Sequence, residues 1–295
     1  MKHSLIITLI LATIFLLAQV IGLSIVNEYV DTKDIVTGNV TYKQLPYNLE
    51  RPPVEESNSF YYIMSAILIG TALLLILIKF NKTSLWKFWF FLSVWITLGV
   101  AFAAFINEII AGLLALVFAL WKVLKPNIIM HNITELFVYG GLAAIFVPIM
   151  NLFAIFVLLI LISIYDAIAV WKSKHMIKLA EFQTKSKVFA GLLIPYSLPK
   201  KEKSNKIEKL KGKVKLVKVQ VKNALLGGGD IAFPLLFAGV VLKHYTFLQT
   251  LIIPLVTTIA LLLLFLKSEK NKFYPAMPFL TVGCFVGYGI ILLLF

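Results

Sequence analysis

Long runs of apolar residues, separated by short segments rich in charge, proline or asparagine, dominate this chain. A membrane core about 30 Å thick is crossed by an α-helix of about 20 apolar residues. Nine runs approach that length, which predicts an all-α, polytopic membrane protein with nine transmembrane helices. The predicted spans are 4–26, 60–80, 85–106, 109–124, 133–148, 151–171, 223–242, 246–266 and 275–295.

The composition agrees with a location in lipid. Of the 295 residues, 60% are hydrophobic and 14% are charged, which is more apolar surface than a soluble domain of this length hides in its core. The net charge of +14 comes from basic residues between the apolar runs. No nucleic-acid-reading motif accompanies them, so we expect no nucleic-acid partner. The single cysteine excludes a disulfide framework and a cysteine-based metal site.

The basic residues also predict the orientation, because lysine and arginine are retained on the cytoplasmic side during insertion. With the N-terminus in the cytoplasm, 24 of the 28 basic residues face that side, 15 of them within 172–222. We therefore expect a multi-pass protein of the cell membrane, with helices 1–6 in 1–171, a basic cytoplasmic loop at 172–222 and helices 7–9 in 223–295. An apolar patch at 188–195 is expected to lie on the membrane surface or to dock into the bundle.

Two acidic residues fall inside predicted spans. Of the fourteen, ten lie in loops, and Glu108 and Glu135 lie at span boundaries. This leaves Asp166 in the sixth span and Asp230 in the seventh. A carboxylate in hydrocarbon costs several kcal/mol, so we expect both to face a bundle interior or a wet cavity. Counted along helices, Asp166 lies about 7 to 8 Å and Asp230 about 10 Å from the cytoplasmic face, which makes the two carboxyl groups level.

A level pair of carboxyl groups predicts a specific chemistry. Two such groups a few ångströms apart cannot both ionise readily, so one keeps its proton. The ionised group removes a proton from water, and the protonated group polarises the scissile carbonyl. This predicts an aspartic endopeptidase that needs no metal and no cofactor. The alternative is a proton- or cation-coupled transporter, or an ion leak channel, that uses the same two aspartates.

Three glycines, Gly227, Gly228 and Gly229, immediately precede Asp230. Each glycine in a helix costs about 1 kcal/mol relative to alanine, so a compensating role is expected. One such role is an unwound backbone whose N–H and C=O groups pair with an extended substrate. The other is close packing of helices through small residues.

Two prolines mark the start of the last span, in the sequence Pro275, Ala276, Met277 and Pro278. They remove two backbone donors, which favours either irregular backbone lining a wet cavity or a proline-initiated helix start. Tyr165 directly precedes the first aspartate of the pair. We expect it to pack beside the two carboxyl groups or to contact substrate, and to need a hydrogen-bond partner.

These motifs occur in order on the sixth, seventh and ninth spans. They are Tyr165-Asp166, Gly227-x-Gly229-Asp230 and Pro275-Ala276-Met277-Pro278. The ordered set resembles the presenilin and signal-peptide-peptidase family of intramembrane aspartyl proteases. The resemblance implies that Asp166 and Asp230 are the catalytic pair and that the Pro-Ala-Met-Pro segment helps to form the active site and engages substrate. The family usually has leucine where this chain has Met277, and the similar volume of methionine predicts retained activity.

The orientation predicted from the lysines is similar to that of the presenilin branch. The short loop at 172–222 and the lack of a large hydrophilic N-terminal region resemble a compact microbial, archaeal homologue. The resemblance implies transmembrane proteins or peptides as substrates, with no requirement for partner subunits. In some members of the family this loop is cut during maturation, and the patch at 188–195 is expected to act either as a plug or as a cleavage site.

Overall fold

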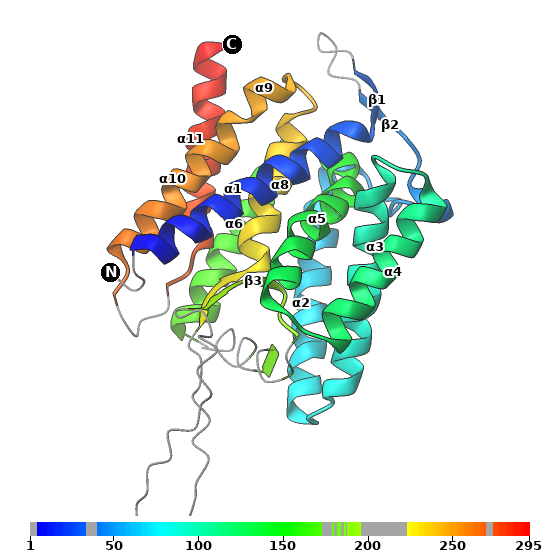
Figure 1. Cartoon of the computed structure of the whole chain (residues 1–295). Coiled ribbons are helices and arrows are strands. Elements are labelled where there is room, and N and C mark those ends of the chain that lie inside the picture. Colours follow the sequence, from blue (N-terminus) through cyan, green and yellow to red (C-terminus); the bar gives the residue numbers. More distant parts are fainter. Residues whose placement is uncertain are drawn as a thin grey trace, which may run out of the picture.

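A computed structural model describes most of the chain, and its helices form one bundle (Figure 1). The described residues are 5–33, 40–172, 179, 182–183, 186, 188–195, 223–269 and 274–295. The helices are α1 (Leu5–Glu28), α2 (Ser59–Lys79), α3 (Thr83–Ala103), α4 (Glu108–Leu124), α5 (Ile128–Phe146), α6 (Leu152–Ala167), α8 (Gly228–Val241), α9 (Phe247–Thr250), α10 (Ile252–Lys267) and α11 (Met277–Leu294). Most of the predicted basic loop, including 196–222, lies outside the described residues.

The nine predicted spans each correspond to a helix. Seven helices within the described part of the chain are long and apolar enough to cross a membrane. The other two are α4, with 17 residues, and α8, with 14. The prediction of an all-α, polytopic membrane protein is therefore confirmed.

Asparagine side chains cap the N-termini of three of these helices. Asn107, Asn127 and Asn151 each accept a hydrogen bond from a backbone N–H in the first turn of α4, α5 and α6. The cap at Asn127 starts α5 at Ile128, ahead of the predicted boundary at 133. That boundary is wrong, and its correction places a set of polar residues inside the helix rather than in a loop.

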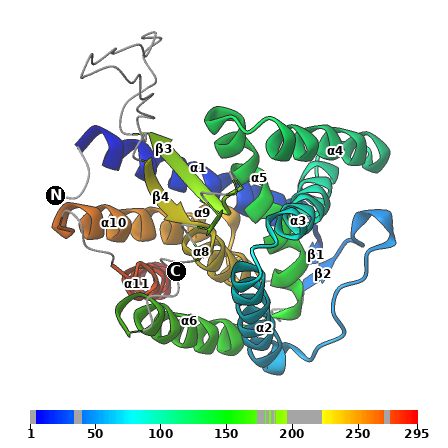
Figure 2. The same ribbon diagram turned by 90° about the horizontal axis from the view of Figure 1, so that it is seen from below.

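Helix α8 lies at the centre of the bundle. It packs against α1, α5, α6, α10 and α11, and Figures 1 and 2 show it surrounded by them. From Ile231 to Val241 every residue except Phe233 is buried. A helix that is apolar on all sides is typical of such a core position. Its 14 residues span about 21 Å, which is shorter than the membrane core, so another element must cover the remaining depth.

That element is strand β4 (Asn223–Gly227), where the sequence prediction of a helix from residue 223 is wrong. It pairs antiparallel with β3 (Gly191–Pro195), with Gly191 opposite Gly227. Gly191 has a φ of +147°, which only glycine adopts readily, and a Cβ there would lie 2.2 Å from the Leu226 carbonyl oxygen. The depth of Asp230 counted along a helix from residue 223 is therefore wrong too.

The apolar patch at 188–195 docks into the bundle, which decides between the two predicted locations. Val188, Phe189 and Leu192 are buried, and the indole N–H of Trp86 on α3 lies 3.4 Å from the Val188 carbonyl oxygen. Figure 2 shows β3 on the side of α5, with β4 between it and helices α10 and α11. The sheet thus closes the end of α8 at which Asp230 lies.

Glycines let α5 approach its neighbours closely. A Cβ at Gly140 would lie 2.9 Å from the Cα of Gly22 on α1, and a Cβ at Gly141 would lie 1.9 Å from the carbonyl oxygen of Thr97 on α3. Close backbone contact through small residues is the usual way in which membrane helices pack tightly. Helix α5 is therefore held firmly on two sides.

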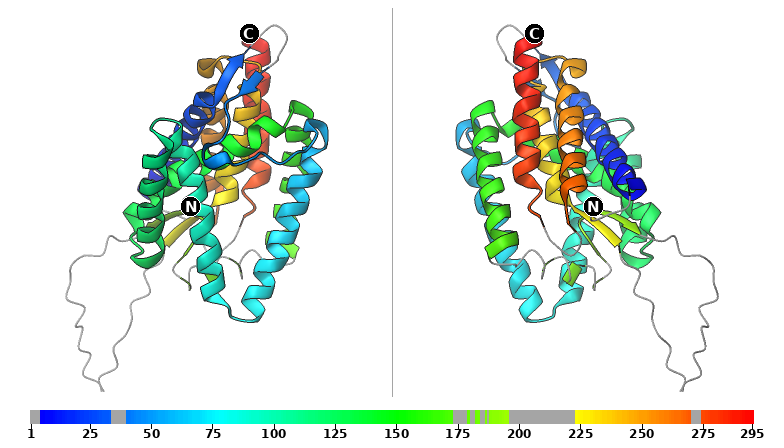
Figure 3. Two further views of the ribbon diagram at one scale, coloured as in Figure 1. Left: turned by 90° about the vertical axis from the view of Figure 1, so that its right-hand side faces the viewer. Right: turned by 90° about the vertical axis from the view of Figure 1, so that its left-hand side faces the viewer.

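The opposite end of the bundle carries the hairpin of β1 (Val30–Lys33) and β2 (Val40–Tyr42), as Figure 3 shows. Lys243, 6% exposed, follows α8 at this end. Its ammonium group donates to the carbonyl oxygens of Met150 at 2.6 Å and Pro148 at 3.3 Å, and to Glu56 Oε1 at 3.3 Å. One lysine thereby ties the end of α8 to the connection between α5 and α6.

We predict that Lys243→Met lowers the midpoint of thermal unfolding in detergent. The substitution leaves buried carbonyl groups without a donor, at a cost of about 1 to 3 kcal/mol for each such group. The control is Lys79→Met, which changes an exposed lysine in the last turn of α2. Equal midpoints for the two variants would show that Lys243 does not hold this end of the bundle together.

Candidate active site

Asp166 lies near the end of α6, where the helix widens into a π-helical turn at Ile168–Lys172. Such turns are frequent at functional sites. The side chain is 5% exposed. Its Oδ2 accepts a hydrogen bond from the backbone N–H of Met277 at 3.1 Å, and the N–H of Ala276 also donates to the carboxyl group. The Pro-Ala-Met-Pro segment therefore contacts this aspartate directly through its backbone.

The position of this segment explains the contact. Pro275 precedes α11, which begins at Met277, and Pro278 occupies its first turn. The first N–H groups of a helix have no partner inside the helix, and they carry a partial positive charge. Two such groups at the start of α11 bind the carboxyl group of Asp166. Pro278, which has no N–H, sits where a helix tolerates that loss.

Asp230 lies in the first turn of α8, and the N–H of Gly227 donates to its carboxyl group. It is near enough to Asp166 for the charges of the two carboxyl groups to interact. Asp230 is only partly buried and Gly229 is exposed, so the turn reaches the surface of the protein. The ends of α6, α8 and α11 thus bring together the two acidic side chains that the sequence singled out.

The three glycines differ in how much space surrounds them. A Cβ at Gly227 would lie 3.2 Å from Asp230 Oδ2, and one at Gly229 would lie 3.3 Å from a ring carbon of Phe233. A Cβ at Gly228 would lie 2.7 Å from the hydroxyl oxygen of Tyr139. Gly228 is therefore the position of the turn at which a side chain cannot be accommodated without a shift.

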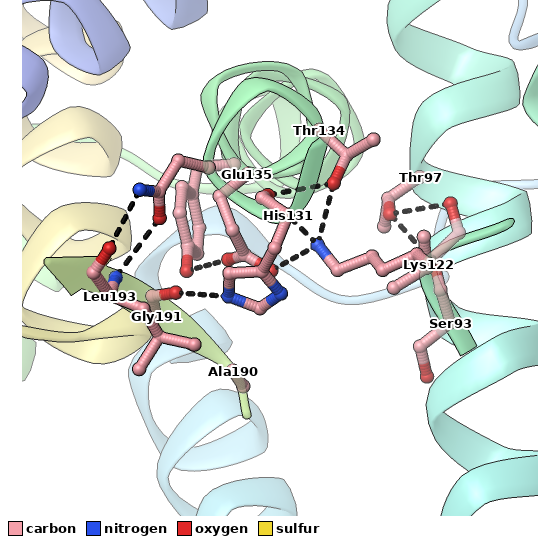
Figure 4. Close-up of polar contacts among 12 residues, drawn as sticks. Ser93, Thr97, Lys122, His131, Thr134, Glu135, Ala190, Gly191 and Leu193 are labelled. Atoms are coloured by element: carbon pink, nitrogen blue, oxygen red, sulfur yellow. Dashed lines mark hydrogen bonds and ion pairs between the residues drawn. The ribbon is translucent and has the colours of Figure 1, made fainter. Parts of the chain in front are cut away.

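The N-terminal part of α5 holds the sheet beside this turn. His131 Nε2 lies 2.7 Å from the Gly191 carbonyl oxygen, so this nitrogen carries the proton. The Asn132 side chain donates to the Leu193 carbonyl oxygen at 2.8 Å and accepts from the Leu193 N–H at 3.0 Å. Figure 4 shows His131 and the strand residues meeting in this way. The edge of β3 that faces α5 is therefore hydrogen-bonded to side chains.

The sequence prediction missed these residues because it started the fifth span too late. It also placed Glu135 at a span boundary, whereas Glu135 lies within α5 and is 1% exposed. A signal was present: His131, Asn132 and Glu135 have the spacing of one helix face, and they follow the helix cap at Asn127. Read in that way, the polar run predicts a helix with one polar side.

Tyr165 faces away from the sheet. Its hydroxyl donates to Thr71 Oγ1 on α2 at 3.3 Å, which supplies the expected hydrogen-bond partner. The side chain is partly buried between α6 and α2. A role for Tyr165 beside the two aspartates stays a prediction.

Comparison with known proteins gives one family across nearly the whole chain. A family model described as signal-peptide peptidase, presenilin aspartyl protease matches residues 12–295. Two similar solved structures are described as a presenilin family intramembrane aspartate protease, in C222 and P2 space groups. The first has a TM-score of 0.62 at 19% identity and covers 98% of this chain and 99% of the other. The second has a TM-score of 0.61 at 18% identity and covers 97% of each chain. Comparison with curated protein sequences gives no match.

We predict that Gly228→Ala lowers the rate of peptide cleavage about tenfold, because displacement of the turn moves Asp230. The matched control is Gly289→Ala on α11, which adds the same methyl group where nothing lies within 4 Å of it. We expect it to cleave nearly normally, since alanine is the better helix former. A fluorogenic transmembrane peptide measures the rate. Equal rates for the two variants would contradict the tight fit at Gly228.

Proposed function

This chain belongs to the signal-peptide peptidase and presenilin family of aspartyl proteases, and from that membership we propose which residues catalyse its reaction and what it cuts. Asp166 and Asp230 are the catalytic pair of an intramembrane endopeptidase. Its substrates are transmembrane segments or remnant signal peptides of other proteins. The observation that carries the proposal is the placement of the two acidic side chains. Asp166 is bound to the start of α11, and Asp230 lies in the first turn of α8, which packs against both α6 and α11.

The hydrogen bonds support a different proposed role for each carboxyl group. The carboxyl group of Asp166 accepts hydrogen bonds from two backbone N–H groups at the start of α11. The carboxyl group of Asp230 accepts one, from the N–H of Gly227. Bonds from donors favour the ionised form of an acid, so Asp166 carries the charge and Asp230 the shared proton. Asp166 then removes a proton from the attacking water. Asp230 donates a hydrogen bond to the scissile carbonyl as its oxygen becomes negative.

The substrate adds a strand to the sheet at β4. The N–H of Gly228 bonds to the Ala190 carbonyl oxygen at 3.0 Å, so in this register Leu226 bonds to β3 and Leu225 points its backbone groups away from β3. The outward groups of Leu193 on β3 are bonded to Asn132, which leaves the β4 side for a peptide. A strand paired there has an extended backbone, and its peptide bond is accessible beside Asp230.

The lysine distribution supports an orientation with the N-terminus and the β3–β4 end in the cytoplasm. Both aspartates then act near the cytoplasmic side of the cell membrane. The enzyme works without partner subunits. No observation favours the transporter alternative, which requires ion flux that depends on the same two residues.

We predict that Asp166→Ala and Asp230→Ala each abolish cleavage of a fluorogenic transmembrane peptide by the purified protein. Each removes half of a unit that acts together, so either loss stops the reaction. Glu55→Ala, which changes an exposed acid at the other end of the bundle, serves as a control and should cleave normally. Full activity in either aspartate variant rules out the pair. Aspartate-dependent ion flux into liposomes without hydrolysis would favour the transporter.

We also predict that Leu225→Pro lowers kcat/KM about tenfold while the protein stays folded. Proline removes an N–H that faces away from β3, which an edge strand tolerates, but the substrate strand loses its partner. Leu225→Ala, which loses the side chain and keeps the N–H, should have a smaller effect. Leu226→Pro removes an N–H bonded to β3 and should also lower the midpoint of thermal unfolding. Normal kcat/KM for Leu225→Pro would refute pairing at this edge.

A further inference from the structure

A buried ion pair lies near the turn of Gly227, Gly228 and Gly229, which we call the glycine turn. Lys122, in the last turn of α4, is 3% exposed, and Glu135 of α5 is 1% exposed. The Lys122 ammonium group donates to Glu135 Oε1 at 2.5 Å and to Thr134 Oγ1 at 2.8 Å (Figure 4). The pair therefore joins α4 to the polar side of α5.

Stability is a weak explanation for such a pair. Taking both charges out of water is costly, and replacing a buried ion pair by apolar residues of similar volume is often neutral or stabilising. The surroundings here are partly apolar, since the ring of Phe90 lies 5.6 Å from Lys122 Nζ. We therefore expect the pair to have a role that apolar side chains cannot fill. The second carboxylate oxygen of Glu135 indicates this role, because it binds another side chain.

Glu135 Oε2 accepts a hydrogen bond from the hydroxyl of Tyr139, one helical turn further along α5. Tyr139 is 5% exposed, and its ring belongs to the main hydrophobic core. Packing in the core fixes the ring of Tyr139, and the hydrogen bond to Glu135 fixes its hydroxyl. Both ends of the side chain are therefore held in place, and the ion pair holds the polar end.

The anchored hydroxyl lies against the turn that carries Asp230. Its oxygen would be 2.7 Å from a Cβ at Gly228, which precedes Asp230 by two residues. On its other side, Gly228 is bonded through its N–H to Ala190 at 3.0 Å. The first residue of α8 is thus held between a strand and a tyrosine. Because the first turn of a helix moves as a unit, the position of Gly228 sets the direction of the Asp230 side chain.

We propose that Tyr139 is a positioning residue for Asp230 and that the Lys122–Glu135 ion pair acts through it. The proposal rests on the proposed function, in which Asp230 is catalytic. Lys122 holds Glu135 in place, and Glu135 holds the Tyr139 hydroxyl. The glycine turn packs against that hydroxyl. A misplacement of a catalytic group by about 1 Å can lower a rate about 100-fold. Loss of the contact between the Tyr139 hydroxyl and the glycine turn therefore slows turnover without weakening substrate binding.

The first test compares two buried tyrosines in the full-length purified protein. Tyr139→Phe should lower kcat about tenfold and leave KM within about twofold of wild type. The control is Tyr29→Phe, because the Tyr29 hydroxyl is also buried and donates to the Val100 carbonyl oxygen at 2.7 Å, away from Asp230. It should leave kcat unchanged. Wild-type kcat in Tyr139→Phe, or equal losses of kcat in both variants, overturns the proposal.

A second test replaces the ion pair by apolar residues, in Lys122→Met combined with Glu135→Leu. The double variant should stay folded in a thermal unfolding scan, yet its kcat should fall about tenfold because Tyr139 loses its anchor. Adding Tyr139→Phe should lower kcat no further, since the pair acts through that residue. Additive losses, or normal kcat in the double variant, contradict the proposal.

Asp230→Ala, assayed in parallel, separates failure of this proposal from failure of the proposed function. If Asp230→Ala still cleaves the peptide, the catalytic pair itself is wrong. If Asp230→Ala is inactive while Tyr139→Phe and the double variant turn over normally, the pair stands and the positioning role of Tyr139 alone is overturned.

Discussion

Backbone inside a membrane must find its hydrogen-bond partners within the protein, because lipid offers none. The candidate active site depends on this constraint, since β4 and the glycine turn place extended backbone at the end of the central helix α8. Strand β3 bonds to one edge of β4, and α5 closes the far edge of β3 through His131 and Asn132. The remaining edge of β4 lies beside Asp230. In the proposed function, a peptide that completes the sheet at this edge also takes up the extended conformation that hydrolysis of its backbone requires.

Helix α5 supports this arrangement although it carries neither aspartate. Its glycines, Gly140 and Gly141, press it against α1 and α3, and its polar side faces the sheet and the start of α8. A helix that is fixed on two sides can keep a strand and the glycine turn in fixed positions relative to the hydrophobic core. The turn that carries Asp230 needs such outside support, because glycines give its backbone little stiffness of its own.

The sequence predicted the membrane helices and the family, because long apolar runs and an ordered set of motifs are strong signals. It also singled out Asp166 and Asp230, whose role in catalysis stays a prediction. It failed at residues 223–227, where Ala224, Leu225 and Leu226 are apolar and suit a helix or a buried strand equally. The choice of strand depends on β3, a distant segment whose pairing no local pattern reveals. It also missed the contacts of Glu135 and Tyr139, because these join different helices, through Lys122 and Gly228.

The two aspartates differ in how firmly their supports hold them. Asp166 stands on a long helix and is bound by two N–H groups from the start of α11, so its carboxyl group is fixed by regular structure. Asp230 stands on the first turn after three glycines, where the chain changes from strand to helix. The separation of the pair is therefore set mainly by the turn. Gly228 has no side chain, so the backbone of the turn can pass close to the Tyr139 hydroxyl. The rigidity that glycine removes must come from the residues packed around the turn, which include Tyr139 and, through it, the buried pair of Lys122 and Glu135.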